Sequence, residues 1–405
     1  MNRTLARVGI VLAALLLGWL SIAVTFANTA ASNAPSLALR LWPHHAVAHA
    51  RLADTLLASG AQAAPTAQPA QLAEAAQQAA EALRRNPTLP GPARILAMQA
   101  AIRGDGRQSD RLLDYSAQLS RRDIPTQFWL IEKRVQANDV EGALSHFGIA
   151  LQVAPSTREV LFPVLSSALS HQHLRRPIAE LAHRGDDWRS EFLYYVAAHA
   201  DPASAGTLFL ILAQLGTPPA APHLQGLIER MVAAGNVAGA ARLYALVDRG
   251  WRLGDAGAQL DGGFARDGDL PPFGWELNQN IAWRGPRPDQ AGNNALQVNL
   301  PQSGQDWVAR KLLLLAPGHY RLAAAYGMMD GGSGRLRFEI ACSRGGSVTA
   351  ALTAAVNRPA GALAGTLDIP AGCSQQWLTL QAAGEGDTSG RLWLDDLRFA
   401  PDRRN

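Results

Sequence analysis

The sequence predicts a multidomain chain with an N-terminal transmembrane helix, an all-α helical repeat domain and a C-terminal all-β sandwich. Three observations favour this fold class: an unbroken apolar run near the N-terminus, a middle rich in Ala, Leu, Gln and Arg, and short alternating apolar runs after Trp251. We assign residues 1–34 to a cytoplasmic tip, an anchor or signal and a short linker, 35–253 to the helical domain and 254–405 to the sandwich.

The composition excludes several classes of protein. The chain has 405 residues, of which 48% are hydrophobic and 17% charged, so high-charge disorder is excluded for most of its length. Its two cysteines cannot make a disulfide-dense scaffold or a four-thiolate zinc site. The net charge is only +4, and only Lys133 and Lys311 among the 37 basic residues are lysines. The arginines are spread along the chain, so we expect no nucleic-acid partner.

The N-terminal segment has the pattern of an export signal or a membrane anchor. Arg3 and Arg7 precede an apolar run over residues 8–27, and twenty helical residues span about 30 Å, the thickness of a bilayer core. A secretory signal has an apolar stretch of only ~7–15 residues, so the length favours an uncleaved anchor. The small residues Thr25 and Ala27 would also permit cleavage, which leaves a secreted or periplasmic chain as the alternative.

The basic residues also predict an orientation. Positive flanks stay cytoplasmic, so we expect a single-pass protein of the bacterial inner membrane with the bulk of the chain in the periplasm.

The middle of the chain is typical of helices of about 10–16 residues separated by Asn-Pro, Gly-Asn and Gly-Asp turns. The clearest segment runs from Phe128 to Pro155, with a turn at Asn138-Asp139. Its apolar residues fall on one helix face: Ala143, Phe147, Ala150 and Leu151. We expect Pro155 to end this helix. An irregular all-α domain is the alternative to a repeat array.

This Ala, Phe, Ala and Pro spacing resembles the second helix of a tetratricopeptide repeat (TPR). The same offsets recur, with Ala in place of the aromatic residue, at Ala75, Ala79, Ala82 and Pro87, and in degenerate form at Ala240 and Tyr244. The resemblance implies a helical array that docks a protein partner, although such arrays bind many kinds of partner.

After Trp251, short alternating runs bounded by Gly, Pro or Asn predict an antiparallel sandwich. The expected strands are 295–299, 307–315, 318–326, 335–341, 365–369, 376–381 and 391–400.

The two ends of this region resemble the galactose-binding-like jelly rolls found among carbohydrate-binding modules. The region opens with Leu260-Asp261-Gly262-Gly263-Phe264 and then Gly274-Trp275, and it closes with Leu392-Trp393-Leu394-Asp395-Asp396-Leu397. The resemblance implies a jelly roll that contacts a glycan. Some members of this family hold a structural calcium ion through an acidic residue of the first strand. In this sequence Ala265 stands at that position, so Asp395 and Asp396 are the remaining candidate ligands. We expect no other cofactor.

Both cysteines, Cys342 and Cys373, lie in the predicted sandwich. An exported chain meets an oxidising compartment, so we expect them to form a disulfide. Two buried free thiols are the alternative.

Sugar rings stack on exposed aromatic faces, so tryptophans are the first candidates for glycan contact. We select Trp283 in a Gly/Pro-rich loop, Trp307 after a polar pair, and Trp393, which faces away from its neighbouring leucines. We expect Trp275 and Trp377 to lie in the core.

We find no nucleophile elbow, phosphate loop or nucleotide fingerprint, and no acid near the His45 and His49 pair, so we predict a non-enzyme. The adjacent Asp395 and Asp396 point to opposite faces of a strand and cannot act as a facing acid–base pair.

The domain combination resembles accessory proteins of bacterial exopolysaccharide or capsule assembly and export, with repeats for a protein partner and a jelly roll for a glycan. A purely structural assembly factor without sugar affinity is the alternative, and a glycan hydrolase is a further one.

Overall fold

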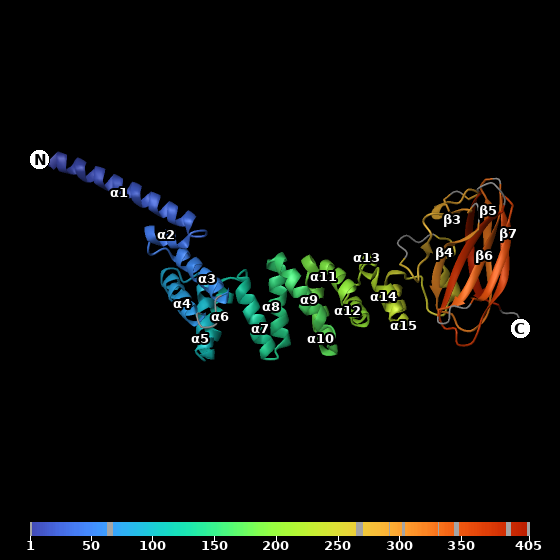
Figure 1. The fold of residues 1–405 in the computed structure, drawn as a ribbon, viewed down its shortest axis with the longest axis horizontal. Coiled ribbons are helices and arrows are strands. Elements are labelled where there is room, and N and C mark those ends of the chain that lie inside the picture. The colour runs from blue at the N-terminus through green and yellow to red at the C-terminus, as the bar shows by residue number, and fades with distance from the viewer. Residues whose placement is uncertain are drawn as a thin grey trace. The chain divides into compact units, whose positions relative to one another are not determined.

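A computed structural model describes residues 2–62, 68–264, 270–290, 292–301, 304–330, 332–343, 348–385 and 390–402 (Figure 1). It divides into two compact units, Met1–Leu161 and Phe162–Asn405.

The first unit is helical. Its helices are α1 (Asn2–Ala30), α2 (Pro35–Leu41), α3 (Ala46–Gln62), α4 (Gln68–Arg85), α5 (Pro90–Ile102), α6 (Gly106–Leu119), α7 (Ile124–Gln136) and α8 (Val140–Val153), followed by the 3-10 turn Pro155–Thr157 and the start of α9 (Arg158–Ala168).

Helix α1 is long and apolar enough to cross a membrane or to serve as a signal sequence, and it is the one such helix in the described part of the chain. Its apolar side chains are exposed to solvent over most of its length, so little of it packs on the rest of the unit. An apolar helix with this exposure suits a lipid environment better than water.

Helices α3 to α8 pack in consecutive pairs, α3 with α4, α5 with α6 and α7 with α8. Aspartates fix where three of them begin, because each accepts a hydrogen bond from the exposed backbone N–H groups of the first turn. Asp105 accepts from the backbone N–H of Gln108 at 3.0 Å, and Asp139 accepts from that of Gly142 at 2.9 Å. Asp123 does the same for α7.

The expected face of α8 is buried. Ala143, Phe147, Ala150 and Leu151 are each at most 6% exposed, and the helix ends at Val153, just before Pro155. Ala75, Ala79 and Ala82 on α4 are likewise fully buried. The helix phase is therefore confirmed, while the assignment of these pairs to TPR units stays a prediction.

The second unit continues the helices after α9. They are α10 (Gln172–His183), α11 (Asp186–His199), α12 (Pro202–Gln214), α13 (Ala221–Leu224), α14 (Leu227–Ala233), α15 (Val237–Val247) and α16 (Ala256–Leu260).

An aromatic cluster joins these helices to the sandwich within the second unit. The ring of Phe273 lies 5.6 Å from those of both Tyr244 and Trp251, measured between centroids. All three side chains are buried. This contact fixes the last helices against the strands that follow.

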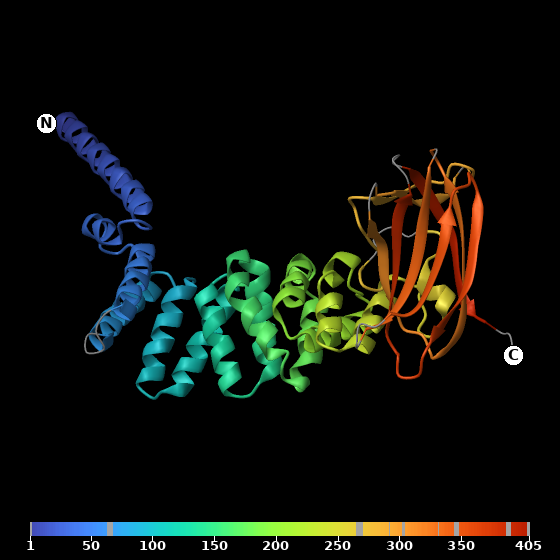
Figure 2. The same cartoon turned by 45° about the vertical axis from the view of Figure 1, so that its right-hand side comes forward.

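Among the described residues, ten strands form the sandwich (Figure 2). They are β1 (Glu276–Leu277), β2 (Ala282–Pro286), β3 (Asn294–Asn299), β4 (Gln305–Leu313), β5 (Gly318–Met328), β6 (Ser333–Cys342), β7 (Val348–Val356), β8 (Gly361–Ile369), β9 (Gln376–Glu385) and β10 (Arg391–Pro401). The first sheet has the order β1-β4-β9-β6-β7 and the second β2-β3-β10-β5-β8, and the paired strands are antiparallel. The prediction of a C-terminal antiparallel sandwich is confirmed.

Alternate residues of both sheets bury an apolar core between them. Leu296, Leu322, Leu336, Leu378 and Leu394 are examples from five strands, and none of them is exposed. This is the expected result of the period-2 alternation of a β-strand with one buried face.

Lys311 of β4 lies among these apolar side chains and is 1% exposed. Its ammonium group donates a hydrogen bond to the backbone carbonyl of Leu260 at 3.0 Å and lies 5.1 Å from the ring centroid of Trp275. A buried cation is tolerated only with such partners.

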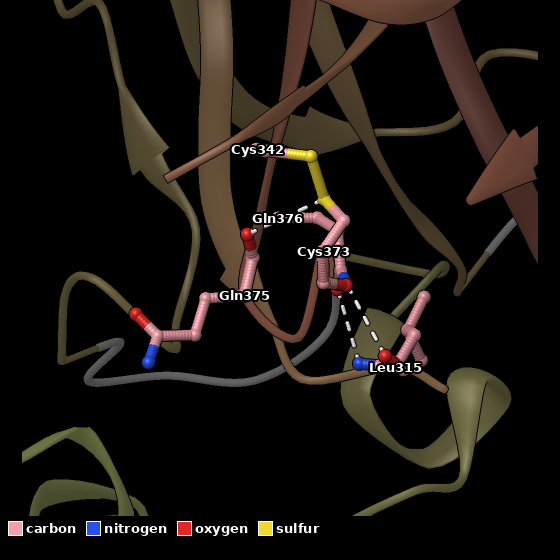
Figure 3. Close-up of a disulfide and its surroundings, with 5 residues drawn as sticks. All are labelled: Leu315, Cys342, Cys373, Gln375 and Gln376. Carbon is pink, nitrogen blue, oxygen red and sulfur yellow. Dashed lines mark hydrogen bonds between the residues drawn. A yellow bond between two sulfur atoms is a disulfide. The ribbon is translucent and has the colours of Figure 1, made fainter. Parts of the chain in front are cut away.

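The predicted disulfide is present (Figure 3). It joins Cys342 at the end of β6 to Cys373 in the turn before β9, with the two Cα atoms 5.5 Å apart. Next to it, the buried Gln376 accepts a hydrogen bond from the backbone N–H of Leu315 at 3.0 Å and donates one to the carbonyl of the same residue at 3.1 Å. The crosslink therefore lies where β4, β6 and β9 are tied together.

Reduction of the disulfide is expected to lower the melting temperature of the sandwich by roughly 5–10 °C or more, because opening a loop of this length releases about 3–4 kcal/mol of chain entropy in the unfolded state. Differential scanning calorimetry of the oxidised and reduced chain measures the shift. Two reactive thiols per denatured chain, in protein that was never reduced, would contradict the pairing.

Candidate functional site

The outer face of the first sheet carries aromatic and charged side chains that are only partly covered. On β9, the side chains of Gln376, Leu378 and Leu380 point into the core, while Trp377 and Thr379 are half-buried on the other side. The alternation along β9 places Trp377 outward, so the prediction that it lies in the core is wrong.

The register of the sheet brings side chains from four strands together. Opposite Thr379 lie Arg310 of β4 and Glu339 of β6, and opposite Gln381 lie Trp307 and Arg337 of the same strands. We call this surface the β9 face. It comprises Glu276, Trp307, Arg310, Arg335, Arg337, Glu339, Trp377, Thr379 and Gln381.

Arg310 lies between the two tryptophans of the β9 face. Its guanidinium carbon is 5.2 Å from the ring centroid of Trp307 and 5.4 Å from that of Trp377. Both rings are half-buried and therefore keep part of their surface accessible. An arginine between two rings holds them in place through cation–π attraction.

Glu276 of β1 holds the other side of the same arginine. Arg310 donates from Nε to Glu276 at 2.7 Å and from Nη2 at 2.9 Å, which is a bidentate pair. These hydrogen bonds raise the pKa of the Arg310 guanidinium. The arginine is therefore charged and fixed in direction.

A second polar network crosses from β4 to β6. Glu339 accepts hydrogen bonds from Arg337 Nε and, at 3.2 Å, from Gln381 Nε2, and Gln381 in turn accepts one from Gln305. The β9 face thus offers two aromatic rings beside hydrogen-bond donors and acceptors. This is the combination that binds a sugar ring by its apolar face and its hydroxyl groups.

The three tryptophans selected from the sequence lie in three different settings. Trp307 is on the β9 face. Trp283 lies on the edge strand β2 of the second sheet and is 37% exposed. Trp393 of β10 is 3% exposed, so it offers no free ring face to a ligand, which corrects our expectation for this residue.

The cause of this burial is Arg287, from the β2–β3 connection. Its guanidinium carbon lies 4.4 Å above the ring of Trp393. On β5, a side chain at Gly327 would collide with the Trp393 ring, because an added Cβ would lie 2.4 Å from Nε1. Glycine at that position therefore lets the ring lie flat against the neighbouring strand.

Arg287 also forms hydrogen bonds with both candidate calcium ligands, Asp395 and Asp396. Its Nη1 donates to Oδ2 of Asp395 at 2.8 Å and to Oδ2 of Asp396 at 2.9 Å, and Asn293 donates to the same oxygen of Asp395 at 2.9 Å. Oδ1 of Asp395 is buried and has no hydrogen-bond partner among the described residues.

Calcium takes about 6–8 oxygen ligands, so one unpaired carboxylate oxygen beside a guanidinium group does not fit it. No cluster of three or more His, Cys, Asp or Glu side chains suited to a metal occurs among the described residues. Ala265, at the position of the family's first-strand acid, lies outside the described residues.

Ser190 and His223 in the helical part form a hydrogen bond of 2.9 Å between Oγ and Nε2, the geometry of a nucleophile and its base. However, Nδ1 of His223 accepts the backbone N–H of Ala220 at 3.2 Å, so in the neutral ring the proton is on Nε2. Burial lowers the pKa of the His223 imidazole, which favours this neutral form. His223 therefore donates to the serine instead of activating it.

A cavity of about 1170 Å³ in the first unit is a second candidate site. Residues of α3, α4, α5 and α7 line it, among them Leu57, Met98 and Phe128. At its wall the buried Arg94 forms ion pairs with Asp54 at 2.7 Å and with Asp123 at 3.2 Å. Its lining is mainly apolar with a fixed charged cluster.

Comparisons with known proteins found similar chains among solved structures. No family model matches the chain, and no curated protein matches it. Among solved structures, the chain is similar to a module described as TmCBM61 in complex with β-1,4-galactotriose, with 14% identity, a TM-score of 0.27 and coverage of 37% of this chain and 99% of that one.

It is also similar to a structure described as CBM4, with 16% identity, a TM-score of 0.28 and coverage of 35% and 98% of the two chains. The CBM22-1 xylan-binding domain from Paenibacillus barcinonensis Xyn10C has 14% identity, a TM-score of 0.28 and coverage of 35% and 91%.

Proposed function

We propose that this chain is a non-catalytic binding protein whose sandwich contacts a glycan through the β9 face. The observation that carries the proposal is the pair of half-exposed rings, Trp307 and Trp377, on either side of Arg310. Sugar rings stack on such surfaces through their C–H groups, and the neighbouring carboxylates, amides and guanidinium groups bind hydroxyls.

Replacing Trp307 or Trp377 with alanine is expected to weaken glycan binding at least about tenfold, because each change removes one stacking surface. Trp283→Ala is the matched control, since this exposed tryptophan lies on the other sheet. A glycan array identifies a ligand, and isothermal titration calorimetry then compares the three variants. A loss confined to Trp283→Ala would place the binding surface on the second sheet and overturn the proposal.

The non-catalytic character is supported by the spacing of the acids. Glu276 and Glu339 are the carboxylates of the β9 face, and three strand spacings, about 14 Å, separate their backbones. The paired acids of glycoside hydrolases have carboxyl groups about 5–9.5 Å apart that face the scissile bond, whereas Glu276 and Glu339 are each turned toward an arginine. His223 likewise gives no support to a site with a serine nucleophile, because its ring donates a hydrogen bond to Ser190 and does not accept the serine proton. We propose no cofactor, and the geometry around Asp395 speaks against structural calcium.

The helical part docks a protein partner in this proposal, and the cavity around Arg94 is the observation that favours it. The domain combination further suggests a role in exopolysaccharide or capsule assembly, as a scaffold in the bacterial envelope. Pull-down with Phe128→Ala, a variant of a cavity-lining side chain, tests the docking: capture of the same partners by this variant as by the wild type would count against the cavity.

Residues 8–27 anchor the chain in the inner membrane in this proposal, with the bulk in the periplasm. The full-length chain is then expected to stay with membranes after a high-salt wash, because the burial of α1 is hydrophobic and salt does not weaken it. Mass spectrometry that finds a mature chain starting near Asn28 would replace the anchor by a cleaved signal.

A further inference from the structure

We propose that the β9 face selects uncharged oligosaccharide chains and rejects glycans that carry carboxylates. This inference rests on the proposed glycan binding and adds the chemical class of the ligand. It follows from how the charges of the face are paired and from how far apart its two tryptophans lie.

Each arginine of the β9 face already lies in an ion pair with a carboxylate of this chain. Arg310 pairs with Glu276 at 2.7 Å, and Arg337 pairs with Glu339. Arg335 pairs with Glu385 at the edge of the face. The three positive charges are thus matched by three negative ones. An anionic glycan gains no net attraction from such a surface.

The geometry of the Arg310 pair adds a second obstacle. Carboxylates are recognised by the planar fork of a guanidinium group, and Glu276 already takes Nε and Nη2 of Arg310. A uronic acid at this position would have to displace Glu276 or bind beside it against like-charge repulsion.

Hydroxyl groups fit the same pairs well. A guanidinium group has five N–H donors, of which Arg310 gives two to Glu276, so three remain. Each carboxylate has about four lone-pair sites, and Glu339 uses only some of them on Arg337 and Gln381. A sugar hydroxyl both donates and accepts, so it can bind both members of an ion pair without breaking it.

The two tryptophans require a ligand longer than one sugar. Trp307 lies opposite Gln381, which follows Trp377 by four residues on β9, a rise of about 13 Å along the strand. The Arg310 guanidinium carbon lies 5.2 Å from one ring centroid and 5.4 Å from the other, so a ligand that contacts both rings must extend across the arginine. The ligand is therefore a chain, which passes over Arg310 and Thr379 between the rings.

The test uses two sets of polysaccharides: uncharged galactan, xylan and β-glucan, and the uronates polygalacturonate and alginate. Affinity electrophoresis of the full chain is expected to retard it with at least one uncharged polymer and not with the uronates. Raising the salt concentration is expected to leave that retardation unchanged, because no net ionic attraction contributes.

The variants Glu276→Gln and Glu339→Gln sharpen the test. Each frees one arginine from its charged partner, so weak retardation by the uronates, absent in the wild type, is expected to appear in low salt. Asp330→Asn is the matched control, because it neutralises the partner of Arg391 in an exposed pair of the second sheet. This control is expected to bind every polymer as the wild type does.

Salt-sensitive binding of uronates by the wild-type chain, equal to or stronger than its binding of the uncharged polymers, would overturn the selection but keep glycan binding by the β9 face. Unchanged uronate affinity in both glutamine variants would also overturn it. Failure to bind any polymer in either set or on a wider array would remove the proposed function itself, and the selection with it.

Discussion

Replacing Arg287 with alanine is expected to destabilise the sandwich by about 3–5 kcal/mol, because it leaves a buried carboxylate without its counter-charge. The side chain of Asp395 is 1% exposed and that of Arg287 is 11% exposed. Arg287 also binds Asp396 and, at 2.8 Å, Asp289, and these pairs raise the pKa of its guanidinium group. Arg287 therefore ties the segment between β2 and β3 to strand β10.

Hydrogen exchange of β10 peptides, followed by mass spectrometry, measures this effect without assuming that the whole chain unfolds in one step. Arg391→Ala is the matched control: its pair with Asp330 is exposed on both sides, so we expect a change of only about 0–1 kcal/mol. Adding Asp395→Asn to Arg287→Ala should recover part of the stability, since no buried charge is then unpaired. Equal effects of the two alanine variants would contradict this account.

Phe147→Ala is expected to destabilise the helices of the first unit by about 3–5 kcal/mol, the usual cost of removing a buried phenylalanine ring. The side chain is 6% exposed and lies on the same face of α8 as Ala143 and Leu151. The small neighbouring alanines cannot expand to fill the space that the ring leaves, so the cavity persists.

Phe128→Ala makes the same chemical change on the adjacent helix α7, where the ring is 37% exposed. Its effect is expected to be less than half as large, because water already reaches part of the ring. Hydrogen exchange of α7 and α8 peptides compares the two variants. A change below about 0.5 kcal/mol for Phe147→Ala would mean that its side chain is not part of the core.

The sequence predicted those parts of the fold that depend on local periodicity. The alternation in residues 376–381 and 391–400 and the helical spacing around Phe147 each reflect one buried face, and the structure confirms both. Strand β7 (Val348–Val356) was missed because its residues are mainly Ala and Thr, and alanine is depleted in strands and gives no apolar alternation.

The tryptophans mark the limit of such reasoning. Trp393 points away from its neighbouring leucines, as alternation requires, but Arg287, more than a hundred residues earlier in the chain, covers it. No local pattern contains that contact. Trp377 is the opposite case, because the sequence already held the signal: Trp377, Thr379 and Gln381 alternate with Leu378 and Leu380, which places the tryptophan on the polar side.

The burial of Lys311 has a practical consequence for binding experiments. Of the two lysines in the chain, Lys133 on α7 has a side chain that is 41% exposed, whereas Lys311 is enclosed beside Trp275. Reagents that couple to amines will therefore attach this protein to a sensor chip or a dye through the helical part and not through β4. Immobilised in that way, the chain keeps Trp307 and Trp377 open to a dissolved glycan.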